Sequence, residues 1–150
     1  MKQVIALVVL LSVFVGCASA PPKLEEQPRV VLNTTATKEK VSNAFLQKLQ
    51  TYGFSVEVVN PGMIQTGWKQ IGRRVFGYSD EYQFTYTLSG DSTTTTIVGT
   101  GQTRSVKTPS LTGGMQNQTW QPEPLKSSSP VFKELERVAK EAKELAEQSK

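Results

Sequence analysis

Residue types that could carry out catalysis are scarce in this chain of 150 residues. It contains no histidine and a single cysteine, which excludes Ser-His-Asp and Cys-His catalysis, imidazole metal ligands and a cysteine-rich zinc site. The aspartates are Asp80 and Asp91, both at positions typical of turns. Asp80 and Glu81 together supply two carboxylates, whereas calcium needs about six oxygen ligands. The sequence therefore predicts a protein that is not an enzyme and that holds no metal and no cofactor.

The single cysteine, Cys17, follows an apolar segment at the N-terminus. Residues 4–15 are apolar apart from Ser12, and Lys2 places positive charge before them. A membrane-spanning helix needs roughly 20 apolar residues. This shorter run is typical of the apolar region of a secretory signal peptide.

Two cleavage sites compete after this run. Residues 18–20, Ala-Ser-Ala, match an A-x-A site, but cleavage there would leave Pro21 first, and its ring constrains the bond to be cut. Residues 14–17, Phe-Val-Gly-Cys, resemble the lipobox of bacterial lipoproteins. That resemblance implies that residues 1–16 are a removed signal peptide and that Cys17 carries a diacylglycerol, which attaches the protein to a membrane. Ala18, in place of the Asp that retains lipoproteins in the inner membrane, implies the outer membrane, with the domain facing the periplasm.

Residues 17–28 are predicted to be a lipidated tether, because they contain three prolines and show no apolar period. Extended Pro-rich chain rises about 3.1 Å per residue, so this tether would reach roughly 30 Å. Residues 29–150 are then expected to form a single domain.

The apolar pattern of that domain predicts strands and two helices. Apolar residues recur at helical spacing between Thr37, a possible N-cap, and Gly53, a possible C-cap. A second amphipathic helix is expected after Ser129 and Pro130. Strand patterns occupy residues 30–32, 54–58, 64–68, 82–88 and 93–103, with Gly99 and Gly101 marking a bulge or a close approach. These elements predict an α+β fold with two layers: an antiparallel sheet of about four to five strands with two helices on one face, in the order β-α-β-β-β-β-α.

Residues 69–80 are predicted to be an exposed loop that carries a candidate interaction site. Arg73, Arg74, Phe76 and Tyr78 place two cations beside aromatic rings between glycines. Arginine forks suit phosphate or carboxylate groups, so the loop could contact lipid head groups or an acidic partner. Alternatively, it is a solvated hairpin end whose Phe76 packs back onto the sheet.

Residues 105–129 are polar and rich in Pro, Gly, Ser and Gln, and they are predicted to be a flexible loop. This stretch contains Trp120, for which two interpretations are open. The indole anchors the loop to the sheet, or it is an exposed anchor for a partner.

The order of elements resembles that of the BamC family, outer-membrane lipoproteins of the β-barrel assembly machinery that are built from helix-grip domains. The match runs from Val-Val-Leu at residues 30–32 through the first helix into the strand at 54–58, and it resumes with the strand at 82–88 and the last helix from Phe132. The resemblance implies a helix-grip-like fold and a role in envelope assembly.

Together these features predict a non-enzymatic outer-membrane lipoprotein that acts as an accessory or interaction module with an envelope protein partner. The alternative is a periplasmic module that binds lipid or peptide in a cleft between helix and sheet. The formal net charge is +4, or +3 once Lys2 is removed, and it is spread along the chain. A nucleic-acid partner is not expected from so weak a charge.

Overall fold

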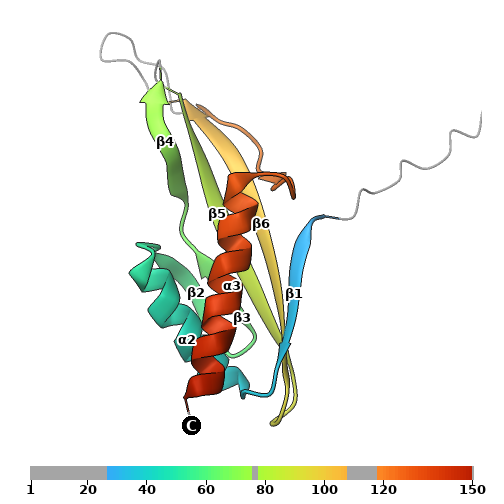
Figure 1. The fold of residues 1–150 in the computed structure, drawn as a ribbon. Coiled ribbons are helices and arrows are strands. Elements are labelled where there is room, and N and C mark those ends of the chain that lie inside the picture. The colour runs from blue at the N-terminus through green and yellow to red at the C-terminus, as the bar shows by residue number, and fades with distance from the viewer. Residues whose placement is uncertain (1–26, 76–77, 108–117, 150) are drawn as a thin grey trace, which may run out of the picture.

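In a computed structural model, residues 27–75, 78–107 and 118–149 form one antiparallel sheet with two helices (Figure 1). The long strands are β1 (Arg29–Thr34), β2 (Val56–Asn60), β3 (Met63–Thr66), β4 (Lys69–Val75), β5 (Tyr78–Gly90) and β6 (Thr95–Lys107). The short strands are β7 (Gln118–Thr119) and β8 (Glu123–Pro124), and the helices are α2 (Lys38–Thr51) and α3 (Pro130–Gln148). The predicted α+β class and antiparallel sheet are therefore confirmed. The predicted number of strands is wrong, because the described residues form a sheet of eight.

The strands β5 and β6 form a long central ribbon, paired without a register shift from Tyr78 opposite Lys107 to Gly90 opposite Thr95. The sheet order is β1-β6-β5-β3-β2, and β4 pairs with the first part of β5. Along its other edge β6 pairs in turn with β1, β8 and β7. The ribbon thus joins nearly every other strand, and it runs the length of the sheet (Figure 1).

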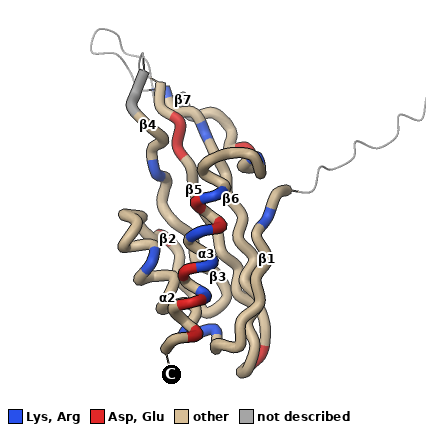
Figure 2. The backbone as a smooth tube through the Cα atoms, in the orientation of Figure 1, with Lys and Arg blue, Asp and Glu red and all other residues tan. Residues whose placement is uncertain are grey.

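Both helices begin as the sequence predicts. The Thr37 side chain accepts a hydrogen bond from the Lys40 backbone N–H, and Ser129 accepts one from Phe132, with Pro130 in the first turn. After α2 the chain turns at Gly53, whose φ of 70° lies in the left-handed region that favours glycine. Charged residues of both signs lie along the length of α3 (Figure 2), and none of them is buried.

The core lies between the helices and one face of the sheet. The ring of Phe45 on α2 lies 4.4 Å from that of Tyr86 on β5, centroid to centroid. The Tyr86 hydroxyl donates to the Leu135 carbonyl of α3, so both helices contact the same face. Neither Phe45, Tyr86 nor Leu135 is exposed at all.

The glycines of β6 allow other side chains to approach closely. Of the two predicted interpretations, a bulge and a close approach, the second is confirmed. A Cβ at Gly99 would lie 3.2 Å from the Tyr86 ring, and a Cβ at Gly101 would clash with Leu125 Cδ1. The ladder between β5 and β6 has no bulge at either position. The small residues therefore make room for core side chains.

The prediction of a loop over residues 69–80 is wrong. Lys69–Val75 is the strand β4, and Tyr78 already belongs to β5. The register shifts between Ile71 and Val75, and Gly72 has a φ of 66°, so the alternation of side chains is interrupted within this hairpin. Because of this interruption, the sequence of β4 does not show the regular alternation of apolar and polar residues from which a strand is predicted.

Other predictions fall partly or wholly outside the described residues. Within 105–129, residues 105–107 belong to β6 and two short strands follow, while 108–117 lie outside the description, so the flexibility of this loop stays a prediction. The signal peptide, Cys17 and nearly all of the tether also lie outside it. Among the residues that are described, no helix is long and apolar enough to cross a bilayer.

Candidate interaction surface

One end of the sheet extends beyond the helices. Figure 1 shows the ends of β4, β5 and β6 continuing past the first turn of α3. The strand β7 pairs with β6 at this end (Figure 2). This end contains the backbone of Arg73 and Arg74, in β4, and of Tyr78, the first residue of β5. Three segments therefore meet here: the β4–β5 hairpin, the end of β6, and β7.

A row of paired residues crosses this end. Ile71 of β4 pairs with Asp80 of β5, which pairs with Ser105 of β6. The Trp120 N–H then donates to the Ser105 carbonyl at 3.1 Å, which continues the ladder by one residue beyond β7. The structure thus places Trp120 on the edge of β6, on the side away from the hairpin that carries Arg73 and Arg74.

The face on which this row lies follows from strand alternation. Lys69 and Tyr82, which are paired, both contact Glu134 of α3: the Lys69 Nζ lies 3.8 Å from it and the Tyr82 hydroxyl donates to it at 2.9 Å. Because side chains two apart along a strand share a face, Ile71 and Tyr78 lie on that same face, beyond the helix. No part of α3 covers them there, and they are exposed.

Large apolar side chains gather at this end. The exposed fractions are 38% for Ile71, 45% for Tyr78 and 58% for Trp120. These are three of the five large hydrophobic side chains that are exposed in the described parts of the chain; the others are Val31 and Val59. We call Ile71, Tyr78, Lys107 and Trp120 the tip surface.

The charges near the tip surface are arranged differently on the two faces of the sheet. On the tip face, Lys107 Nζ lies 5.6 Å from the centre of the Tyr78 ring, and Asp80 accepts a hydrogen bond from the Ser105 hydroxyl. On the opposite face, Arg104 stacks at 4.0 Å on the Trp68 ring and donates from two nitrogens to one oxygen of Glu81. The charge of Arg104 is therefore matched by a carboxylate, whereas Lys107 remains beside an aromatic ring.

The predicted site residues have different outcomes. Tyr78 lies on the tip surface, while the side chains of Arg73 and Arg74 and the whole of Phe76 lie outside the description. For Trp120, the backbone anchors the segment to β6, and the indole is exposed beside a hollow of about 170 Å³. Sequence analysis missed Ile71 and Lys107, although Ile71 follows Lys69 at the spacing of a strand face.

The described residues include no group of three cysteine, aspartate or glutamate side chains placed to hold a metal ion. Burial, and then the hydrogen bond to Glu134, raise the pKa of the Tyr82 hydroxyl, which belongs to the contact between α3 and the sheet. The raised pKa of Tyr82 is therefore explained by the packing of α3 against the sheet.

No protein-family model matches the chain, and no curated protein sequence matches it. Its function is accordingly inferred from its own residues.

Proposed function

We propose that the protein is a non-enzymatic lipoprotein of the outer membrane, anchored by lipid on Cys17, which binds an envelope protein partner through the tip surface. The observation that carries this proposal is the gathering of three exposed large apolar side chains at the end of the sheet beyond α3. Exposed aromatic anchors are enriched at the centres of protein interfaces. The lipobox-like residues 14–17 support the anchor.

The resemblance to the BamC family supports the same proposal. A helix packed across an antiparallel sheet is compatible with a helix-grip-like fold, and such domains occur there in lipoproteins of envelope assembly. A role in the assembly of the envelope or its outer-membrane proteins is the function that we infer from it.

The alternative, a module that grips lipid or peptide beneath a helix, is less well supported. Phe45, Tyr86 and Leu135 are unexposed and fill the space between the helices and the sheet. A ligand at that place would have to displace close-packed core side chains, at a cost of several kcal/mol.

The experiment is photo-crosslinking in intact cells. A photo-reactive amino acid in place of Trp120 should yield an adduct with an envelope protein, while the same amino acid in place of Val59, which is 49% exposed on β2, should not. Truncation by Tyr78→Ala in the Trp120 crosslinking chain should weaken the adduct roughly 30-fold, the effect of losing a hot-spot aromatic worth about 2 kcal/mol. Equal adducts from both positions would contradict a specific tip surface.

The anchor is tested in the same cells. Cys17→Ser should abolish labelling by a palmitate analogue and release the domain from the membrane fraction. Labelling that persists in this variant would rule out lipid on Cys17.

A further inference from the structure

The strand β1 lies at one margin of the sheet and, among the described residues, it pairs with a strand on one side only (Figure 1). Its ladder with β6 is unbroken, from Arg29 opposite Thr100 to Thr34 opposite Thr95. Every second residue of an edge strand points its backbone N–H and C=O away from the sheet. The outer edge of β1 therefore offers a row of backbone groups to a further strand.

The other long strands at the margins of the sheet, β2 and β4, obstruct such pairing. Natural sheets commonly protect their edges with charged residues, prolines or bulges. The strand β2 has a register shift between Val56 and Val58 and contains Glu57, and β4 has a register shift and three cations. The strand β1 has an unbroken register, no proline and no charged residue after Arg29. Of these three strands, it is the one that is suited to pairing.

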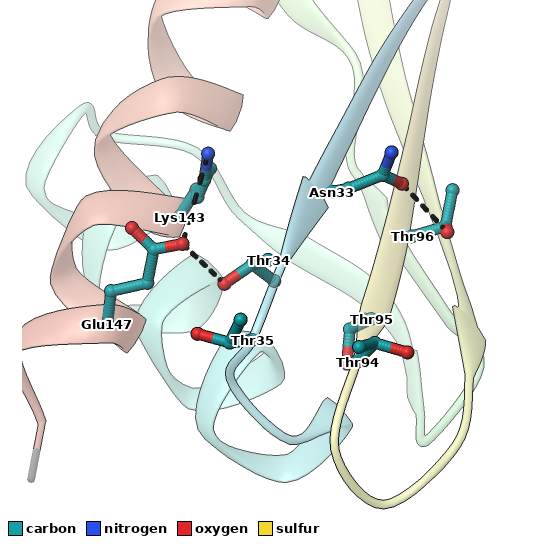
Figure 3. Close-up of a pocket in the computed structure, with 8 residues that line it drawn as sticks. All are labelled: Asn33, Thr34, Thr35, Thr94, Thr95, Thr96, Lys143 and Glu147. Atoms are coloured by element: carbon teal, nitrogen blue, oxygen red, sulfur yellow. Dashed lines mark hydrogen bonds and ion pairs between the residues drawn. The ribbon is translucent and has the colours of Figure 1, made fainter.

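The side chains of β1 alternate between the two faces of the sheet. Thr34 donates to Glu147 of α3, so it lies on the face that the helices cover. In Figure 3 Asn33 points the other way, toward Thr96. Val31 lies two residues before Asn33 and shares this second face, where 52% of it is exposed. The edge thus presents an apolar side chain as well as its backbone.

The sequence of β1 is complementary to itself when two copies run antiparallel. With Val31 opposite Val31 of a second copy, Val30 lies opposite Leu32. Arg29 then lies opposite Asn33, so its charge does not face the same charge. A shift by one residue would pair side chains from opposite faces of the two sheets. A shift by two would leave fewer pairs and would put Val31 opposite a polar residue.

The chain that precedes β1 is compatible with this arrangement. Residues 17–28 lead from the proposed lipid on Cys17 to Arg29, and as an extended tether they reach roughly 30 Å. In the paired strands the two Arg29 residues are offset by four positions, or about 13 Å at roughly 3.3 Å per residue. Both tethers can therefore end in one membrane. This compatibility rests on the proposed anchor, whereas the pairing of β1 does not.

We infer that two copies of this chain pair through β1, edge to edge, and that their sheets continue into one another about a two-fold axis. One six-residue strand from each copy buries less than the roughly 800 Å² per partner that is typical of stable complexes. The dimer is therefore expected to be weak in free solution and to be favoured by the high local concentration on a shared membrane. Because β1 pairs with residues 95–100 of β6, short of the tip surface at Lys107, this inference adds a second interface to the proposed function.

The test is crosslinking of introduced cysteines in intact cells with a short bifunctional maleimide. In the full chain, Val31→Cys should give a dimer, because residue 31 lies opposite its own copy. Val59→Cys, at a position of 49% exposure on β2, is the matched control and should give none. The wild-type chain, treated alike, sets the background from Cys17.

Three outcomes of this experiment overturn the inference. One is the absence of a Val31→Cys dimer above that background, whether or not Cys17 proves to be lipidated. Another is an equal yield of dimer from Val31→Cys and Val59→Cys, because the crosslink would then report collision. The third is an adduct of Val31→Cys with a different protein in place of the dimer, because the edge would then take a strand from that protein.

Charge substitutions then test the register, through energy transfer between two fluorescently tagged copies in intact cells. Val31→Lys in both copies should lower the association constant at least about fivefold, because two ammonium groups face each other and apolar contact is lost. Val31→Glu in both copies should do the same. One copy with Val31→Lys and the other with Val31→Glu should associate more strongly than either matched pair, since opposite charges then meet. Val59→Lys is the control and should change nothing. If the mixed pair is as weak as the matched pairs, residue 31 does not lie opposite itself and the inference fails.

Discussion

Asp91 holds the turn between β5 and β6 through a single carboxylate oxygen. Its Oδ1 accepts hydrogen bonds from the backbone N–H and the hydroxyl of Thr93 and from the same two groups of Thr94, at 2.8–3.1 Å. The bonds from Thr93, and then those from Thr94, lower the pKa of Asp91 from 3.8 to about 2. The sequence predicted a turn at this point, and the structure shows which side chain orders it.

The stability contributed by this carboxylate should depend on pH. A lowered folded-state pKa stabilises the protein above the ordinary pKa, and the contribution is lost as the pH falls from 3.8 through about 2. Chemical denaturation of wild type and Asp91→Ala should therefore show a gap in midpoint above pH 3.8 that closes toward pH 2. Ser92→Ala, an exposed neighbour, is the control. A gap that stays constant over this range would mean that the hydrogen bonds to Asp91 do not favour its charged form.

The helices contribute one buried face each. On α2 that face consists of Val41, Ser42, Ala44, Phe45 and Leu49, and on α3 it includes Leu135 and Val138. The two helices are further joined by Glu141, which accepts from the Tyr52 hydroxyl at 2.7 Å and from Lys48 at 3.2 Å. The bond from Tyr52, followed by the one from Lys48, lowers the pKa of Glu141. This pairing fixes the helices against each other at their exposed edge.

Leu49→Ala tests whether α2 is part of the core. Leu49 is unexposed, so its truncation should lower the free energy of unfolding by about 2–5 kcal/mol, through lost transfer energy and the cavity that remains. Urea denaturation followed by circular dichroism measures the change. Gln47→Ala, at an exposed position on the same helix, should stay within about 0.5 kcal/mol of wild type. An unchanged midpoint for Leu49→Ala would show that the helix face is not core.

At the scale of the molecule, two distant ends have different chemistry. The tip surface combines apolar side chains with Lys107 of β6, and the backbone of Arg73 and Arg74 places two more cations on β4, at the same end of the sheet. At the other end of β6, the side chains of Lys143 and Glu147 on α3 have opposite charges and lie 3.8 Å apart. Association that depends on salt should therefore arise at the tip.

Arg73→Ala combined with Arg74→Ala should weaken association with acidic vesicles or with the crosslinked partner. The loss should be greater at low salt, because the Debye length falls from about 30 Å at 0.01 M to about 8 Å at 0.15 M. Lys133→Ala with Lys140→Ala removes equal charge from exposed positions on α3 and is the matched control. Binding measured by sedimentation across this salt range decides the matter. If the arginine variant binds as wild type does throughout, the hairpin is only a connector.

Features that depend on neighbouring residues could be predicted from the sequence alone. The cap at Thr37, the turn at Gly53 and the start of α3 at Ser129 are interactions within a few residues. The alternation of apolar residues along β5 likewise identifies its buried face, because a strand repeats every two residues. These were predicted correctly.

Features that depend on pairing between distant segments could not be predicted in this way. The two-residue strands β7 and β8 are too short to show any period, and they exist through hydrogen bonds to β6. The tip row joins Ile71, Asp80, Ser105 and Trp120 from three separate segments, and at the other end β1 pairs with β6 while Thr34 donates to Glu147 of α3. Neither place can be read from local pattern, because the contacts that form it are set by the register of strands far apart in the chain.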